Sequence, residues 1–385
     1  MNIKKIFFLS LIMLSFSGSL LAQATTIPAD HPSLYKGVRP TGMGNAFIAM
    51  PGQDENAMFY NPAAINDYEK SLHMRLISPV VDFSPSVISL TKDVIDLADK
   101  IDKDGPDAAK IADFRAFVDK HTGEFETVQF RLPVVTAMHK WFALSLLADS
   151  RTTFSFRNRA FTNIELNSRS DFGGIIGTAY NFKDALGIEQ NIQAGVNVKV
   201  IHRYSIDKVI TADDIVNNAS FGDSIPRNRS TGVGFDIGVK GDVPTFGIGI
   251  LDTLKPTAGL TWQDVGNTRF GAGVPDTDQS ISVGIAVHPM LGNWQFHIAN
   301  DLRELNTDSD FMAKWNIGAE VVAPTMLGFF TPSVRVGGNQ GYISTGASFD
   351  FRFFKLEGSY YGEEVGKFTS QKQLRRVAAN ISFGF

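Results

Sequence analysis

Apolar and polar residues alternate along most of the chain, and this period of two predicts β-strands. Between residues 233 and 239 the apolar side chains Val233, Phe235 and Ile237 alternate with Gly234 and Asp236. An extended chain points successive side chains to opposite faces, so one face of this segment is apolar and the other is not. The same pattern recurs at 192–201, 315–322 and 343–353. The chain is therefore expected to be all-β.

Fourteen segments carry the pattern, and each is near the length of about 9–11 residues that a tilted strand needs to cross a bilayer. They centre on residues 71–79, 128–136, 141–149, 172–180, 192–201, 231–239, 256–262, 281–287, 293–299, 315–322, 332–338, 343–353, 355–361 and 377–385. A secreted soluble β-protein would also alternate, but it would not need polar residues on the inner phase of nearly every strand. Here that phase carries charges of both signs, such as Arg131, Lys199 and Glu320. We predict a transmembrane antiparallel β-barrel of about 14 strands.

The connections between these strands should alternate between short inner turns and longer outer loops. We expect inner turns at 137–140, 288–292 and Phe354, and outer loops at 150–171, 202–230, 263–280, 300–314 and 362–376. The segment around Phe154 and Phe156 is assigned to an outer loop. Two connections depart from the rule, because 240–255 is long for an inner turn and 339–342 is short for an outer loop.

Residues 84–123 have a helical period instead. Apolar residues spaced three and four apart form one stripe at Val87, Leu90, Val94, Leu97 and Ile101, and a second at Ile111, Phe114 and Val118. Gly105-Pro106 can end one helix and begin the next. The pattern predicts a helical hairpin inserted in the first outer loop. It could be a cap that packs on itself, or a lid that binds a protein partner or captures a ligand.

Both ends of the chain indicate export to a membrane. Residues 1–24 have a basic start at Lys4 and Lys5, a short apolar run and the small-residue site Ala22-Gln23-Ala24, which predict a cleaved signal peptide rather than a transmembrane anchor. The chain closes on VAANISFGF, whose apolar face ends in Phe385. This ending resembles the assembly signal of bacterial outer-membrane barrels. The resemblance implies a multi-pass protein of the bacterial outer membrane that contacts its lipid and, through the last strand, the barrel assembly machinery.

Composition narrows the chemistry. The chain has no cysteine, and its formal net charge of −4 argues against nucleic acid as a partner. Its seven histidines are scattered, with no metal-ligand spacing and no arrangement with serine and aspartate. Asp213-Asp214 lies in an expected loop and is interpreted as a solvated pair. We predict no catalytic residue, no metal site and no cofactor, so the chain is not expected to be an enzyme.

The segment PTGMGNAFIAMPGQDENAMFYNPAAI, residues 40–65, fits neither period. Its G-x-G-x-A-F element, acidic small-residue stretch and F-Y-N-P-A element resemble the N-terminal signature of the FadL-like outer-membrane superfamily. That superfamily includes long-chain fatty acid and hydrocarbon transporters, PorV-like secretion components and TraF-like conjugation proteins. The resemblance implies that residues 25–70 form a plug inside a barrel of residues 71–385. Physically, Gly42 and Gly44 permit close approach to a wall, and Asn61-Pro62 ends any helix that begins near Asp54.

The resemblance also implies which residues lie near a ligand. These are Gly42, Met43, Gly44, Asn45, Phe47, Phe59, Tyr60, Asn61, Pro62 and Ala63; the alternative is that they only pack the plug. The leading hypothesis is uptake or passage of hydrophobic compounds such as long-chain fatty acids, with an apolar pocket near the plug. The inward apolar residues Val135, Ile175 and Ala179 are compatible with such a pocket. The alternative is a non-transporting component of a secretion or conjugation system that acts through a protein partner at the 84–123 insert.

Overall fold

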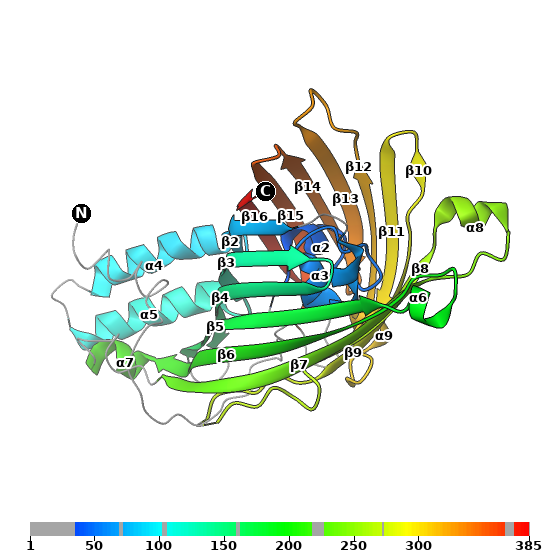
Figure 1. Cartoon of the computed structure of the whole chain (residues 1–385). Coiled ribbons are helices and arrows are strands. Elements are labelled where there is room, and N and C mark those ends of the chain that lie inside the picture. The colour runs from blue at the N-terminus through cyan, green and yellow to red at the C-terminus, as the bar shows by residue number, and fades with distance from the viewer. Residues whose placement is uncertain are drawn as a thin grey trace.

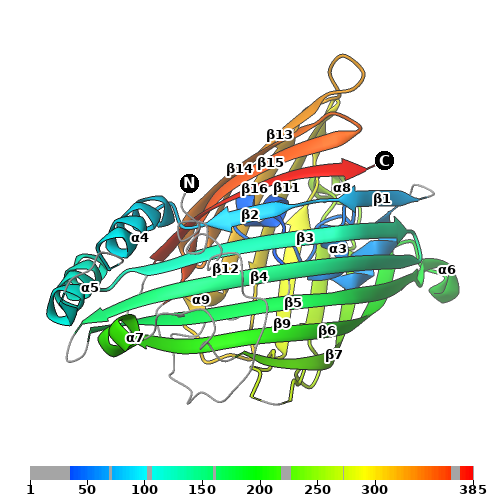
Figure 2. The same cartoon turned by 90° about the vertical axis from the view of Figure 1, so that its left-hand side faces the viewer.

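The computed structural model describes residues 35–68, 72–101, 106–158, 162–217, 227–271, 273–365 and 373–384, which form a closed antiparallel barrel (Figures 1 and 2). The strands follow one another in chain order around the wall, and the first strand pairs with the last. Strands β1 (His73–Ile77) and β2 (Val80–Phe83) are two parts of one broken strand, and the two-residue β10 (Met290–Leu291) pairs only with β11. With β1 and β2 counted as one strand and β10 left out, the barrel has fourteen strands, as the alternation predicted. The predicted signal peptide lies outside the described residues.

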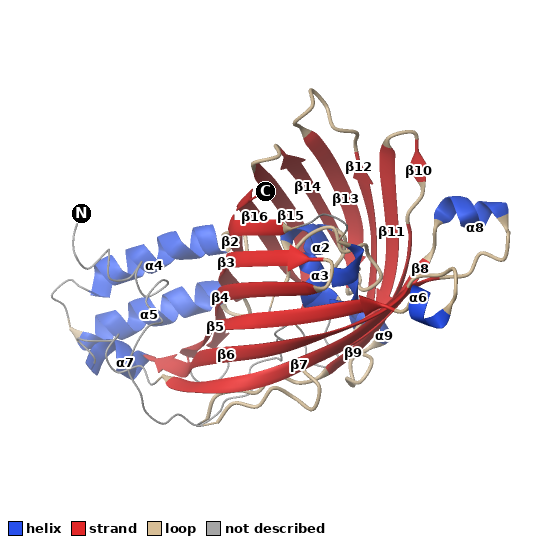
Figure 3. Cartoon of the chain, in the orientation of Figure 1, coloured by secondary structure: helices blue, strands red, loops and turns tan. Residues whose placement is uncertain are grey.

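The other strands are listed here with their bounds: β3 (Phe125–His139), β4 (Phe142–Asn158), β5 (Thr162–Asn181), β6 (Ile192–Thr211), β7 (Asn228–Asp242), β8 (Thr257–Gln263), β9 (Ser280–Val287), β11 (Trp294–Leu302), β12 (Trp315–Val322), β13 (Thr331–Asn339), β14 (Tyr342–Asp350), β15 (Phe354–Glu364) and β16 (Gln373–Gly384). The helices are α2 (Val38–Gly42), α3 (Asn56–Tyr60), the 3-10 helix η1 (Pro62–Asp67), α4 (Val87–Ile101), α5 (Asp107–His121), α6 (Lys183–Leu186), α7 (Ala212–Asn217), α8 (Gly249–Leu254) and α9 (Phe311–Lys314). Figure 3 shows how strands dominate the chain. Within the described ranges, no helix is long and apolar enough to cross a membrane.

The two faces of the wall differ as the alternation predicts. On β6, Val196, Val198 and Val200 point outward and are exposed, whereas Asn197 and Lys199 point inward and are buried. Lys199 finds its partner on the next strand, 2.7 Å from Asp236. The interior is thus lined by paired charges of both signs, and the outside is apolar.

One inward prediction is wrong. The pairing of β3 with β4 shifts register between Pro133 and Val135, which pairs Val135 with the outward, exposed Leu146. A bulge inserts one residue and so exchanges the faces of everything beyond it. Ile175 and Ala179, on a strand without a bulge, are buried on the inside as expected.

Strands β4, β5 and β6 run well past membrane length. The expected outer loop 150–171 is therefore mostly strand, and β6 takes the first part of the expected loop 202–230, as far as Thr211. Phe154 and Phe156, assigned to a loop, belong to β4. Their outward face changes character along the strand. Beyond the exposed apolar residues comes a polar girdle, in which Ser150 and Thr152 hydrogen-bond Ser170 and Ser168 at 2.8 and 2.9 Å. Beyond the girdle the face is apolar again.

Helices α4 and α5 cover this second apolar zone. Phe114, Phe117 and Val118 of α5 are buried in one cluster with Phe156 and other outward residues of the long strands. Lys120 of α5 lies 2.7 Å from Asp93 of α4, which ties the two helices together. Figure 2 shows the hairpin beside the far ends of the long strands, close to α7. The two helices therefore lie against the outer surface of the wall.

The remaining connections differ little from expectation. The turn between β14 and β15 is 351–353, so Phe354 belongs to β15 and not to the turn. The short outer connection is the two-residue turn Gln340-Gly341, where both residues have positive φ. The long inner connection between β7 and β8 contains α8.

Candidate functional site

Residues 35–68, called here the N-terminal segment, lie inside the barrel (Figures 1 and 2). Nearly all of them are buried, although the segment holds only three short helices, α2, α3 and η1. Asn61 ends α3 in an extended conformation, and its side chain accepts a hydrogen bond from the Ala63 N–H at the start of η1. Pro62 is the first residue of η1, where its missing N–H is not needed. The Asn-Pro pair thus separates two helices, as its chemistry predicts.

A belt of inward-facing glycines on the barrel wall receives this segment. The glycine belt consists of Gly177, Gly195, Gly238, Gly259, Gly284, Gly318, Gly337 and Gly346, on strands β5 to β9 and β12 to β14. A Cβ atom added at any of them would lie between 2.0 and 3.0 Å from an atom of the segment. Three direct cross-strand pairs occur within the belt: Gly195 with Gly238, Gly259 with Gly284, and Gly318 with Gly337.

The closest approach of the wall to the backbone of the segment is at Gly318, whose added Cβ would lie 2.1 Å from the Met43 carbonyl oxygen. Gly44, next in the segment, has φ +62 and would itself collide with the backbone of β12 and β13 if it carried a side chain. Glycine is therefore required on both sides of this contact, where segment backbone meets wall backbone. Such contact leaves no room for a side chain or a bound molecule between the two.

Polar groups of the wall also hold the segment backbone. The carboxylate of Asp301 on β11 accepts hydrogen bonds from the N–H groups of Phe47 and Ile48 at 2.6 and 2.9 Å. The Asn61 side chain donates to the carbonyls of Ile48 and of Val239 on β7, at 3.0 and 3.1 Å. Buried backbone groups need such partners because no water is available to them. The segment is thus fixed to strands on different sides of the barrel.

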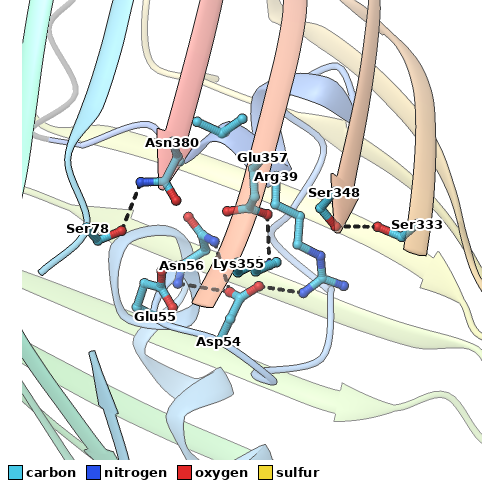
Figure 4. A network of polar contacts seen from close by, with 12 residues as sticks. Arg39, Asp54, Glu55, Asn56, Ser78, Ser333, Ser348, Lys355, Glu357 and Asn380 are labelled. Carbon is cyan, nitrogen blue, oxygen red and sulfur yellow. Dashed lines mark hydrogen bonds and ion pairs between the residues drawn. The ribbon is translucent and has the colours of Figure 1, made fainter. Parts of the chain in front are cut away.

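A buried charge network joins the segment to the last part of the wall (Figure 4). The Arg39 guanidinium lies 2.7 Å from Asp54 within the segment and 2.6 Å from Glu320 on β12. Glu320 also accepts from Arg335 on β13 at 2.6 Å. Burial alone would raise the pKa of Asp54, but the Arg39 charge outweighs burial and holds that pKa below its ordinary value. A single arginine therefore links two carboxylates that burial would otherwise destabilise.

A second link lies nearer the start of the segment. Lys36 pairs with Glu363 on β15 at 2.7 Å, and Glu363 also accepts from Arg376 on β16 at 3.0 Å. Arg376 in turn donates to Asp82 on β2 at 2.8 Å, across the junction of the first and last strands. The segment is therefore tied into the seam that closes the barrel.

The predicted ligand-proximal residues are brought together, but in two different ways. Gly42, Met43, Gly44, Asn61, Pro62 and Ala63 contact the wall, largely through their backbone. Phe47, Phe59 and Tyr60 belong to the buried apolar cluster that also contains wall residues of β3, β4 and β5. The Tyr60 hydroxyl donates to Asn45, and its ring lies 5.3 Å from that of Phe47. These side chains therefore pack on one another and on the wall.

The outer half of the interior is occupied by the loop between β8 and β9. Phe270 of this loop packs on the inward-facing Ile201, and its ring lies 4.1 Å from the Arg203 guanidinium. Arg203 also donates to the Pro275 carbonyl at 2.7 Å and pairs with Asp171 at 2.7 Å. The loop therefore folds inward against β6 and β7. The N-terminal segment and this loop therefore both occupy the interior of the barrel.

Sequence reasoning missed the residues that hold the segment. Arg39 and Asp301 were not singled out, because Glu320 lies 281 residues from Arg39 and the Phe47 N–H lies 254 residues from Asp301. Asp54 was named only as a possible helix start, and its pairing with Arg39 was not predicted. The glycine belt left a visible signal: Gly195, Gly238 and Gly318 all fall on the polar, inward phase of strands recognised by alternation. In the described part of the chain, no group of three or more His, Asp or Glu residues is arranged to hold a metal ion.

Comparison with known proteins finds similarity among solved structures. A deltaS2S3 mutant of the TodX monoaromatic hydrocarbon channel is 11% identical, with a TM-score of 0.47 over 91% of this chain and 97% of that one. The CymD monoaromatic hydrocarbon channel is 10% identical, with a TM-score of 0.45 over 90% and 96% of the two chains. No family model and no curated protein matches the chain.

Proposed function

We propose that this protein is a barrel of the bacterial outer membrane, of the FadL-like kind, through which hydrophobic compounds such as long-chain fatty acids pass. The observation that supports membrane placement is the difference in polarity between the outer and inner faces of the wall. Exposed apolar side chains cover the outside of the barrel, while buried ion pairs line its inside. A soluble protein would not leave so large an apolar surface in water.

In this proposal the N-terminal segment is the plug. Its aromatic and methionine side chains, with Ile175 and Ala179 of the wall, form the largest apolar cluster in the interior of the described chain. An apolar compound that enters the barrel would meet this cluster, and Phe59 and Tyr60 are the residues we assign to contact it. Because the backbone of the segment is fixed by the glycine belt, passage would require side chains to move rather than the whole segment to leave.

Two measurements test the proposal. Mass spectrometry of small molecules that co-purify with the folded barrel should find a retained apolar compound. Displacement of a bound fluorescent fatty acid by competitors then identifies the class: a long-chain fatty acid should compete more strongly than a monoaromatic hydrocarbon such as toluene. Phe59→Ala and Tyr60→Ala should weaken binding, whereas Gly358→Ala, at a site where an added Cβ meets nothing within 4 Å, should not.

A folded barrel that retains no molecule and binds no probe would refute passage of hydrophobic compounds. The second candidate would then be a non-transporting component of a secretion or conjugation system. One observation favours it: the helical hairpin rests on the outer wall, where a protein partner could reach it. Cross-linking from exposed positions on α4 in native membranes would distinguish the two.

A further inference from the structure

The connection between β7 and β8, residues 243–256, exposes an unusual amount of apolar surface. Phe246 is 87% exposed, and Ile248 and Ile250 are also largely exposed. Figure 1 shows α8 standing away from the wall beside the start of β8. The antiparallel order places this connection at the same end of the barrel as the end of β16, opposite the helical hairpin.

The connection is an ordered structure that is stabilised by its own hydrogen bonds. The Val243 N–H donates to the Pro256 carbonyl at 2.9 Å, and Thr245 hydrogen-bonds the Asp252 side chain. The His288 N–H, from the neighbouring connection, donates to the Leu254 carbonyl at 2.7 Å. Phe246 adopts φ 50, a conformation that bulky residues avoid. A strained aromatic at a fixed, exposed tip indicates that the tip contacts something outside the chain.

The other connections at this end of the barrel also expose apolar side chains, and their distribution indicates what the tip contacts. Trp141, Leu186, Leu291, Leu327 and Phe353 are all highly exposed, and each belongs to a different connection around the barrel. A protein partner would cover one side of this rim. Apolar side chains distributed around the whole circumference instead match a lipid leaflet, which surrounds a barrel on every side.

The β7–β8 connection also continues the lipid-facing surface. The outward residues of β7, including Ile237 and Val239, are exposed and apolar, and Val243 follows them in the same register. Within α8, Asp252 follows Ile250 by two residues and so lies on roughly the opposite side of the helix. The short helix is therefore amphipathic, and its apolar side adjoins the band that faces lipid.

We propose that residues 243–256 form an interfacial anchor, which lies along the inner leaflet of the membrane with Phe246, Ile248 and Ile250 among the acyl chains. Asp252 and Lys255 would face the headgroups and water. The occupant is lipid, not protein. This inference rests on the membrane placement proposed above, and goes beyond it by assigning a role to a connection that is too long for an ordinary inner turn.

Because the chain has no cysteine, single cysteines can be labelled cleanly. We would attach an environment-sensitive fluorophore to Phe246→Cys and reconstitute the full chain in phosphatidylcholine bilayers that carry nitroxide lipids. Val198→Cys, on the outward face of β6, is the reference for lipid contact. Leu305→Cys, in the connection after β11, is the reference for water.

We expect the label at 246 to emit to the blue of the label at 305, to be quenched by shallow nitroxide lipids and to resist aqueous iodide. Quenching by iodide at 246, while the label at 198 remains quenched by lipid, would overturn the anchor and leave the barrel in the membrane. Loss of lipid quenching at both sites would overturn membrane placement itself. A label that is exposed in synthetic bilayers but shielded in native membranes would show that the occupant is a protein, which also refutes the proposal.

Discussion

Replacing Gly318 by alanine should loosen the N-terminal segment while the barrel stays folded. The added methyl group would lie 2.1 Å from the Met43 carbonyl oxygen and 2.8 Å from its carbonyl carbon. Both are backbone atoms, so neither can move aside as a flexible side chain would. Overpacking of this kind costs about 1–3 kcal/mol. At about 2 kcal/mol, local opening of the segment would become roughly 30-fold more frequent.

Hydrogen exchange followed by mass spectrometry measures this opening directly. Peptides that cover Phe47 and Ile48 are the most informative, because their N–H groups are protected by Asp301. Their exchange should accelerate in Gly318→Ala, while peptides from β4 and β5 remain unchanged. Gly358→Ala is the matched control, since its added Cβ meets nothing within 4 Å. Equal protection of the segment in wild type and Gly318→Ala would refute the reasoning about the glycine belt.

Three further predictions follow from the contacts of the segment. Asp301→Ala should leave two buried N–H groups without an acceptor, destabilise the segment by about 1–3 kcal/mol for each and speed exchange at those amides only. Arg39→Gln should lower the free energy of unfolding in detergent by about 3 kcal/mol, because Asp54 and Glu320 lose their shared guanidinium; a change below about 1 kcal/mol would contradict this. The pKa of Asp54 is depressed in the folded state, so its contribution is complete above the unfolded pKa of about 4 and is lost as the pH falls through the folded value. The difference in melting temperature between wild type and Asp54→Asn should therefore be constant from pH 7 to 5 and shrink below about pH 4.

Alternation predicted the barrel because it is a local property of each strand, whose two faces meet different surroundings. The lengths of the strands were harder to predict, since each strand was expected to be only as long as a membrane is thick. Phe154 and Phe156 continue the alternation of β4 beyond that limit, but they pack on helices instead of lipid. The prediction that Val135 points inward was wrong for a different reason, because nothing in the alternation locates a bulge.

The interior was less predictable, since its contacts join residues far apart in the chain. The motif around Gly42 and Gly44 indicated a segment in close contact with a wall, and the wall residues carry the matching glycines. The partners of Arg39 could not be identified, because a charged residue in a motif can pair with any carboxylate that the barrel register brings near it. Pairing of this kind depends on closure of the whole wall.

The wide spread of these contacts has a consequence for assembly. Bringing β2 to β16 means joining Asp82 to Arg376, which are 294 residues apart, and the entropy of closing so long a loop opposes this step. The N-terminal segment contacts the wall at many intermediate points, from Asn197 on β6 to Glu320 on β12. Contacts of this kind would reduce the entropy of closure if they formed before the ends of the sheet met. We infer that in assembly the segment is a core around which the wall can wrap.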